Sequence, residues 1–350
     1  MSEIAERPPD VIGPPEKGPP PSGNALWNGF RRAAILFSQQ REASVLIVVV
    51  ALGTYFAISS SQFLTKDNVV NLSQITAPVA IIAIGEVLLL VCGEMDLSVG
   101  FIYMLTPFVM HYLADFYGVP AYLALLLSLG LGAAIGYING FITVVLGVPS
   151  FITTLGTGFI LWGITLTTSR AFPASIPSGA TGIIQHWIGA YAWAEITWAV
   201  ILVVIFQIVL TRTRWGLHTI SVGGNMLGAR EAGVNIAKIK IGNFVITGVA
   251  GSLVGLMEAF RTNTIDPSSG GYTPMFYAIA AAVIGGTALA GGSGTIIGAF
   301  LGAVLLAMLI DGFTILGVSA NPITIFIGSA ILIAMIGNVY LTRLRRAGRT

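Results

Sequence analysis

TRTRWGLHTISVGGNMLGAREAGVNIAKIK, residues 211–240, is the longest polar interruption in a chain otherwise made of apolar blocks. It carries five cations and one acid. Inside it, the Asn225 side chain can cap the start of a short helix, and Gly233 can adopt the left-handed turn that ends one. About seven residues lie between them, or roughly 10 Å of helix, which is too short to cross a bilayer or to be stable alone in water. Residues 225–233 therefore form either a rigid docking point for a partner or part of a loop that is basic because it faces the cytoplasm.

The chain has few charges for its length. Hydrophobic residues make up 55% of it and charged residues 9%, against about 25% charged in soluble domains. No soluble core hides so much apolar surface. Apolar runs of about 20 residues suit helices that cross the hydrocarbon layer, rather than barrel strands. The sequence thus predicts an all-α membrane protein of about ten spans. These are residues 44–60, 77–93, 97–117, 121–146, 151–168, 195–211, 241–260, 275–291, 295–316 and 322–341.

The two ends of the chain differ from its middle. Residues 1–23 hold seven of the sixteen prolines and are predicted to be disordered, because such a composition builds no core. We recognise no cleavable signal peptide there. Residues 24–43 mix apolar side chains with arginines, which predicts a helix lying on the membrane surface. The predicted domains are thus a tail with an interfacial helix at 1–43, a transmembrane domain at 44–342 and a basic tail at 343–350.

Lysines and arginines indicate the orientation. With the N-terminus inside and ten spans, fourteen of the seventeen fall on the cytoplasmic side, as the positive-inside rule requires. Lys66, Arg170 and Arg261 fall outside. Both termini are therefore expected in the cytoplasm, and residues 169–194 and 261–274 become external loops.

One stretch recurs within the chain. NGFITVVLGVPSFITTLG (139–156) resembles DGFTILGVSANPITIFIG (311–328). With ten spans, the first connection lies inside and the second outside, as two related halves of inverted topology would place them. Chance similarity between helices rich in Gly, Ile and Val is the alternative.

Acids inside apolar stretches are costly and point to function. The candidates for a translocation path are Glu86, Glu94, Asp96, Ser98 and Asp311. A second interpretation of Asp96 is structural, because its carboxylate can accept backbone N–H groups at a helix start. The surrounding GEMDLSVG (93–100) is either a cytoplasmic turn or a re-entrant break. Glu258 and Arg261, three residues apart on one helix, are expected to pair with each other.

The chain lacks the common signatures of catalysis and metal binding. It has no Gly-x-x-x-x-Gly-Lys-Ser/Thr phosphate loop, so it is not expected to hydrolyse ATP itself. It has no His-Glu-x-x-His pattern, and its single cysteine, Cys92, excludes an intrachain disulfide and a cysteine-built metal site. No catalytic residue, resident cofactor, metal or nucleic-acid partner is therefore expected.

Four motifs, in order along the chain after its N-terminal tail, carry a family resemblance. They are GEMDLSVG (93–100), VGGNMLGAREAGVNIAKIKI (222–241), AIAAAVIGGTALAGGSGTIIGAFLGA (278–303) and ILGVSANP (315–322). Together they resemble the permease subunits of bacterial ABC importers of the ribose/xylose/galactoside type. Glu86 and Glu94 stand where that family usually carries uncharged residues, and the proline-rich tail is longer than is typical. Both departures leave the substrate open.

The resemblance implies a permease of the bacterial inner membrane that imports a small sugar or sugar alcohol by alternating access. The implied partners are a second permease copy, two cytoplasmic ATPase domains that bind the ATP, an external sugar-binding protein and lipid. An ATPase-coupling helix is implied as well. Its residues are Asn225, Gly228, Ala229, Arg230, Glu231, Ala232 and Gly233. Of the adjacent Arg230 and Glu231, at least one is expected to contact the ATPase and the other to brace the helix on the permease.

Two other classes of protein compete with this interpretation. An ion- or proton-coupled carrier would use Glu86, Glu94 or Asp96 as proton sites. A purely structural scaffold is disfavoured by the acids and the glycine-broken helices within the membrane. A pair of identical copies is preferred to a heterodimer, although the sequence leaves both open.

Overall fold

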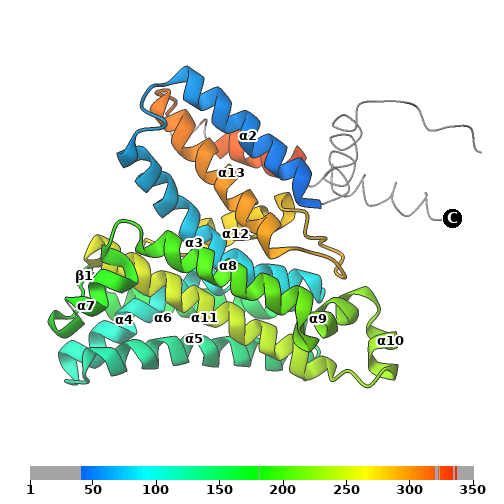
Figure 1. Ribbon diagram of the computed structural model, residues 1–350. Coiled ribbons are helices and arrows are strands. Elements are labelled where there is room, and N and C mark those ends of the chain that lie inside the picture. Colours follow the sequence, from blue (N-terminus) through cyan, green and yellow to red (C-terminus); the bar gives the residue numbers. More distant parts are fainter. Residues whose placement is uncertain (1–40, 181, 320–321, 323, 334–335, 337–350) are drawn as a thin grey trace, which may run out of the picture. The chain divides into compact units, whose positions relative to one another are not determined.

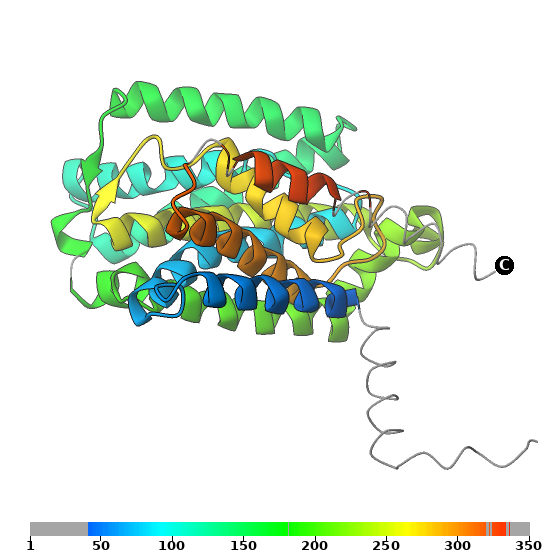
Figure 2. The same ribbon diagram turned by 90° about the horizontal axis from the view of Figure 1, so that it is seen from above.

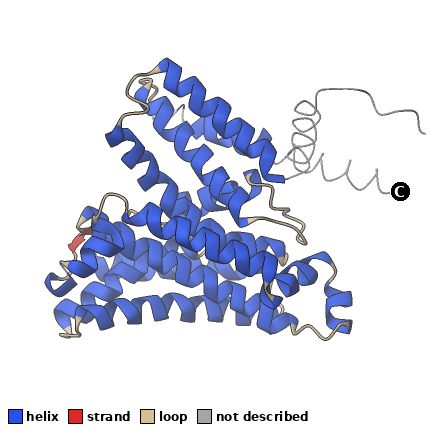
Figure 3. Cartoon of the chain, viewed as in Figure 1, coloured by secondary structure: helices blue, strands red, loops and turns tan. Residues whose placement is uncertain are grey.

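The computed structural model describes residues 41–180, 182–319, 322, 324–333 and 336. The predicted disordered segment 1–23 and the basic tail 343–350 lie outside these residues, as does nearly all of the predicted surface helix 24–43. Within the described part the regular elements are helices apart from one pair of two-residue strands (Figure 3). The prediction of an all-α membrane protein is confirmed.

Eight helical segments of the described chain are long and apolar enough to cross a membrane. They are α2 (Arg41–Ser59), α3 (Lys66–Val91), α4 (Val99–His111) with the π-helical turn η1 (Tyr112–Phe116), α5 (Ala121–Val144), α6 (Ser150–Ser169), α8 (Ala194–Arg212), α11 (Ile236–Thr262) and α13 (Ile296–Ile315). Two further apolar helices are shorter, α12 (Tyr272–Ile284) and the segment Thr324–Ile333. The count of ten spans is therefore not confirmed, because the predicted spans 275–291 and 322–341 correspond to these two shorter helices.

Short elements complete the chain. They are η2 (Ser178–Ala180), α7 (Ile183–Gln185) and η3 (His186–Ala190) before α8, and α9 (Arg214–Gly224) and α10 (Met226–Glu231) after it. The predicted polar loop 211–240 thus contains two helices rather than one. Helix α11 also begins earlier than the predicted 241, because the Asn235 side chain accepts a hydrogen bond from the Lys238 N–H (2.9 Å) and so caps the helix at Ile236.

Helix α3 is the centre of the largest apolar core. Its second half, from Ala77 to Val91, is apolar on every side apart from Glu86, and a helix of that kind is buried all round. Helices α8, α11, α12 and α13 pack against it. Helix α2 lies on the outside of this group and packs on α13 (Figures 1 and 2), where the rings of Phe56 and Phe313 meet edge to face at 5.5 Å. The buried half of α3 is thus enclosed by helices from distant parts of the chain.

Helix α11 runs along α5 at very short range. A β-carbon built on Gly132 would collide with the carbonyl of Gly248, and one on Gly248 would collide with the carbonyl of Gly132. Small residues permit such backbone contact between membrane helices, where packing rather than hydrophobicity drives association. These two glycines therefore hold α5 and α11 together.

The connection between α11 and α12 folds back along α4. Its residues Thr264, Asp266 and Ser269 line a small pocket together with Tyr103 and Pro107 of α4. The Gly271 N–H donates to the Gly100 carbonyl (2.8 Å) near the start of α4. Helix α12 therefore starts beside the start of α4. Its 13 residues extend over roughly 20 Å, less than the hydrocarbon thickness.

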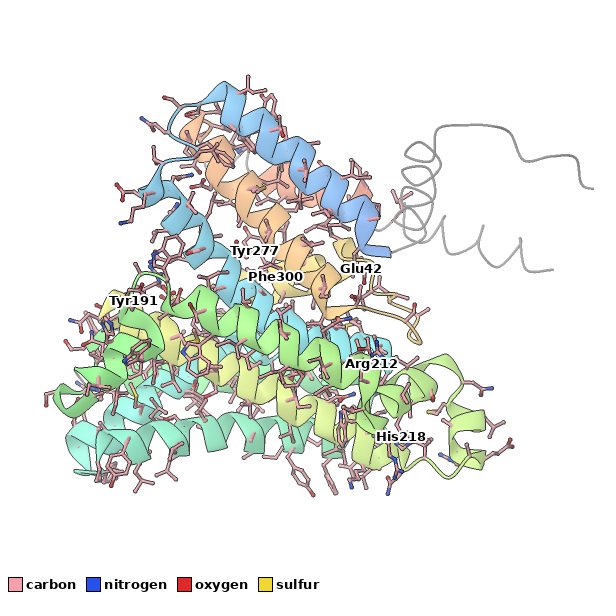
Figure 4. The ribbon with its side chains drawn as sticks, viewed as in Figure 1. Glu42, Tyr191, Arg212, His218, Tyr277 and Phe300 are labelled. Atoms are coloured by element: carbon pink, nitrogen blue, oxygen red, sulfur yellow. The ribbon has the colours of Figure 1, made fainter. Side chains whose placement is uncertain are left out.

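The two ends of the helices carry different structures. At one end β1 (Ala174–Ser175) pairs with β2 (Thr264–Ile265) in antiparallel fashion, which joins the two predicted external loops. Tyr191 lies at this end, whereas Arg212 and His218 lie at the opposite end with α9 and α10 (Figure 4). The two segments that the sequence assigns to opposite sides of the membrane are thus at opposite ends of the helices.

The two similar stretches of sequence share a local structure. In 139–156, α5 ends and Gly147 follows with φ +77° before α6 begins. In 311–328, α13 ends and Gly317 follows with φ +79° before the helical segment Thr324–Ile333. A common origin of two inverted halves remains a prediction.

Candidate functional site

Helix α10 is built by local caps at both ends. At its start the Asn225 Oδ1 accepts a hydrogen bond from the Gly228 N–H (2.9 Å). A β-carbon on Gly228 would approach the Asn225 side-chain nitrogen at 3.0 Å, so glycine leaves room for the cap. The predicted cap at Asn225 is confirmed.

The end of α10 is a Schellman turn. Gly233 has φ +80°, its N–H donates to the Arg230 carbonyl (3.0 Å), and the Val234 N–H donates to the Ala229 carbonyl (3.0 Å). Ala232 is the residue at the helix end, and the chain turns away after it. The predicted role of Gly233 as the turn is confirmed, and six residues of helix, Met226–Glu231, lie between the two caps.

One side of α10 packs on the protein and the rest is exposed. Ala229 is buried in a small apolar cluster with Val234, whereas Arg230 and Glu231 are both exposed. Neither of these charged side chains makes an ion pair with a described residue. Neither side chain therefore braces the helix through an ion pair with a described residue, and Ala229 supplies the packing contact instead. Contact of Arg230 or Glu231 with an ATPase stays a prediction.

Two apolar side chains on α10 were not singled out by the sequence analysis. Met226 and Leu227 are 50% and 66% exposed, at the polar end of the helices and beside Arg230. Their exposure next to charged side chains makes this part of α10 a candidate surface for protein contact. The available signal was their position directly after the Asn225 cap, in a stretch whose other residues are polar or small.

The second candidate region is the buried break between α3 and α4. Glu86, in α3, is 0% exposed, and so is Asp96 in the break. The Asp96 N–H lies 3.5 Å from the Glu86 Oε2, at the limit of a hydrogen bond. Glu86 Oε1 and Asp96 Oδ2 have no hydrogen-bond partner among the described residues. Two neighbouring carboxyl groups are thus buried among the helices, and each has one oxygen without a hydrogen bond to the described part of the chain. Burying a polar atom without a hydrogen bond costs free energy.

Asp96 also has a structural role. Its Oδ1 accepts hydrogen bonds from the Ser98 N–H (2.8 Å) and the Ser98 hydroxyl (2.6 Å) just before α4 begins. The predicted acceptance of a backbone N–H by Asp96 is confirmed. The Asn139 amide of α5 donates to Ser98 Oγ (2.8 Å), and the Thr157 hydroxyl of α6 donates to Asn139 Oδ1 (2.7 Å). A chain of polar groups therefore links the break to α5 and α6.

Burial shows that residues 96–100 are not an exposed turn. All five are buried, and the Leu97 N–H donates to the Thr154 hydroxyl of α6 (3.0 Å). Gly93, with φ +83°, and Glu94 lie nearer the surface. Glu94 pairs with Lys240 of α11 at 2.5 Å, so this acid is neutralised by a cation from the central polar segment.

Asp311 lies apart from this group. Its two carboxylate oxygens accept hydrogen bonds from the side-chain amides of Asn68 (2.8 Å) and Asn71 (2.7 Å), at the start of α3. The structure thus brings Glu86, Asp96 and Ser98 together and places Asp311 elsewhere, with partners that satisfy it.

A third charged group lies at the end opposite α10. The predicted Glu258–Arg261 pair is confirmed, with 2.5 Å between Arg261 Nη2 and Glu258 Oε1. Arg261 Nε also lies 3.6 Å from the buried carboxylate of Glu195 in α8. Arg261 therefore joins α8 to α11. No group of three or more His, Cys, Asp or Glu side chains in the described chain is arranged to hold a metal ion.

Comparison with known proteins decides the family. A family model described as "branched-chain amino acid transport system / permease component" matches residues 68–336, which include nearly all of α3 and every later helix through α13. The chain belongs to this permease family. The family match supports a permease component of an ABC importer over an ion- or proton-coupled carrier.

Curated relatives of the permease cover most of its length. It is 36% identical to the xylose/arabinose import permease protein of Sulfolobus acidocaldarius over 86% of either chain. It is 34% identical to the ribose import permease protein of Escherichia coli, over 85% of this chain and 92% of that protein. It is 29% identical to the fructose import permease protein of Rhizobium meliloti, over 86% of this chain and 85% of that protein. No solved structure matches the permease.

Proposed function

We propose that this permease is the membrane-spanning subunit of an ABC importer that moves a small sugar or sugar alcohol into the cytoplasm. The relatives that support this substrate class are named as import permeases for xylose and arabinose, ribose and fructose. These sugars are small, neutral and rich in hydroxyl groups. Carboxylate oxygens and serine hydroxyls, which the break between α3 and α4 provides, bind hydroxyl groups through hydrogen bonds.

The observation that carries the proposal is the shape and exposure of α10. It is a short rigid helix, capped at Asn225 and Gly233, that presents Leu227, Arg230 and Glu231 at the cation-rich end of the helices. In the proposal this helix docks in a cleft of a cytoplasmic ATPase, and the ATP is bound and hydrolysed there. A docked helix transmits force only if it keeps its shape, and the two caps supply that property.

The proposed translocation path runs past the buried side chains of Glu86, Asp96 and Ser98. Alternating access follows when the ATPase contacts α10 differently in its two states, because only a differential contact shifts the equilibrium between inward- and outward-open permease. Glu94 borders this region through its ion pair with Lys240. Asp311 is left out of the path, since Asn68 and Asn71 satisfy its carboxylate.

The proposed orientation places α9, α10 and both termini in the cytoplasm of a bacterial cell, with the protein in the inner membrane. The β1–β2 pair and η3 then face outside, where a sugar-binding protein delivers the substrate. This orientation rests on the distribution of lysine and arginine.

The test measures sugar uptake while the ATP level and the proton gradient are varied separately. Cells carrying the permease, its ATPase and its binding protein are given radiolabelled D-xylose, L-arabinose, D-ribose or D-fructose. We expect uptake of at least one of them to stop when ATP is depleted and to continue when a protonophore collapses the proton gradient with ATP maintained. Uptake that survives ATP depletion and collapses with the proton gradient would overturn the proposal.

A further inference from the structure

A small apolar cluster joins α10 to the end of α3, separately from the main core. It contains Leu89 of α3, Cys92 directly after α3, Val222 of α9, Ala229 of α10 and Phe244 of α11. The exposed helix α10 and Cys92, the first residue of the break, therefore belong to one cluster. The residues at the centre of this cluster determine how a movement of α10 reaches the end of α3.

Asn243 of α11 is the polar residue at that contact, and it is fully buried. Its side-chain nitrogen donates to the Leu88 carbonyl (3.3 Å) and the Thr219 hydroxyl (3.3 Å), and lies 3.6 Å from the Cys92 Sγ. Its Oδ1 accepts a hydrogen bond from the Trp215 indole N–H (2.9 Å). One amide thus holds α9, through Trp215 and Thr219, to the last turn of α3.

A backbone contact at the other end of α9 reinforces this connection. A β-carbon on Gly223 would collide with the carbonyl of Val91, the last residue of α3. The same carbonyl accepts a hydrogen bond from the Gly292 N–H (2.8 Å), in the connection between α12 and α13. Helix α9 is therefore fixed to the end of α3 at two points, and it continues into α10 with only Asn225 between them.

From these contacts we infer that Asn243 is a positioning residue that transmits movement of α9 and α10 to the break between α3 and α4. The inference rests on the proposed function, in which the ATPase moves α10. Packing of side chains holds two helices in contact. The directional hydrogen bonds of a buried amide also fix how one helix is positioned along the other. Without Asn243, α10 still docks on the ATPase, but its movement no longer displaces residues 92–98 by the same amount.

The experiment uses the complete importer in proteoliposomes and measures two quantities, ATP hydrolysed and sugar taken up. The variants are Asn243→Ala, Trp215→Phe and Thr219→Val. Trp215→Phe removes the indole N–H and, with it, the outer indole ring atoms that pack on Gly242. The control is Trp198→Phe, which removes an indole hydrogen bond of the same length (2.9 Å) to the Trp187 carbonyl at the opposite end of the helices.

We expect Asn243→Ala to bind the ATPase as the wild type does while the ATP hydrolysed per sugar rises roughly tenfold, within the usual range of coupling between sites. Trp215→Phe and Thr219→Val are expected to raise the ratio by smaller factors, and Trp198→Phe to leave it unchanged. If Asn243→Ala does not reach the membrane, the ratios measured for Trp215→Phe and Thr219→Val test the inference. A wild-type ratio in every variant that folds, or the same rise in Trp198→Phe, would overturn the inference.

Failure of this inference is distinguishable from failure of the proposed function. If the ATPase does not use α10, variants of α10 leave ATPase binding unchanged, whatever Asn243 does. If α10 variants weaken ATPase binding but Asn243→Ala keeps the wild-type ratio, the docking helix is correct and its transmission through Asn243 is wrong.

Discussion

Replacing Gly233 with valine tests whether docking depends on the shape of α10. Gly233 has φ +80°, and a β-carbon there would meet no atom within 4 Å. The cost is therefore confined to the backbone, at about 1–2 kcal/mol for an L-residue in the left-handed conformation. If the ATPase binds α10 only with this turn formed, the same strain weakens its affinity about 5- to 30-fold.

The assay is titration of the purified ATPase onto permease in lipid nanodiscs, with the amount of permease in the membrane measured in parallel. The matched control is Gly147→Val, since Gly147 has φ +77°, also has no atom within 4 Å of the added β-carbon, and lies in the turn between α5 and α6. It introduces the same backbone strain outside α10. A Gly233→Asn variant should keep most of the affinity, because asparagine tolerates the left-handed turn.

Unchanged affinity in Gly233→Val, at wild-type membrane level, would refute the reasoning that the turn shapes the docking helix. An equal loss in Gly147→Val would refute it as well, because the strain would then act through general stability. A loss confined to Gly233→Val supports a local role.

Three further predictions concern the helices and the buried acids. Glu86→Gln should insert normally into the membrane, because glutamine has the same shape, and should change the uptake rate or the preference among sugars. Unaltered uptake kinetics for every sugar would mean that Glu86 is structural. Gly248→Ala should lower the thermal unfolding temperature of the purified permease, because its β-carbon meets backbone, whereas Gly130→Ala, which has open space, should not; equal behaviour of the two would contradict the close contact. Lys240→Met should lower stability by about 2 kcal/mol because it leaves the Glu94 carboxylate unpaired, and adding Glu94→Gln should restore most of that loss; an additive double variant would show that the pair is not coupled.

Local signals predicted α10 well. The cap at Asn225 and the turn at Gly233 depend on residues only a few positions away, so both were visible in the sequence. The all-α class followed from composition, since the apolar runs leave no other way to satisfy the backbone inside lipid. The Glu258–Arg261 pair was likewise a neighbour relation on one helix.

Features that depend on tertiary contacts were missed. Helix α9 contains three glycines and polar side chains and therefore reads as a loop, but the Trp215–Asn243 hydrogen bond and the Gly223–Val91 contact hold it in place. Asn243 itself drew no attention, because its four contacts come from residues 24 to 155 positions away. The partners of Asp311 lie 240 and 243 positions away in α3, which no local pattern reveals.

The length of α12 could not be predicted from the sequence either. Its apolar stretch continues into the glycine-rich segment after Ile284, so composition favoured a full span. The fold-back of the preceding connection onto Gly100 places the helix start inside the protein, and that contact is long-range.

The most direct test of the central claim, that α10 docks on a cytoplasmic ATPase, is crosslinking from Leu227. A photo-crosslinking amino acid replaces Leu227, which is 66% exposed on α10, or Trp187, which is 63% exposed at the opposite end of the helices. In the assembled importer we expect position 227 to crosslink to the ATPase and position 187 not to. A crosslink to the ATPase from position 187 and none from position 227 would contradict both the docking helix and the proposed orientation.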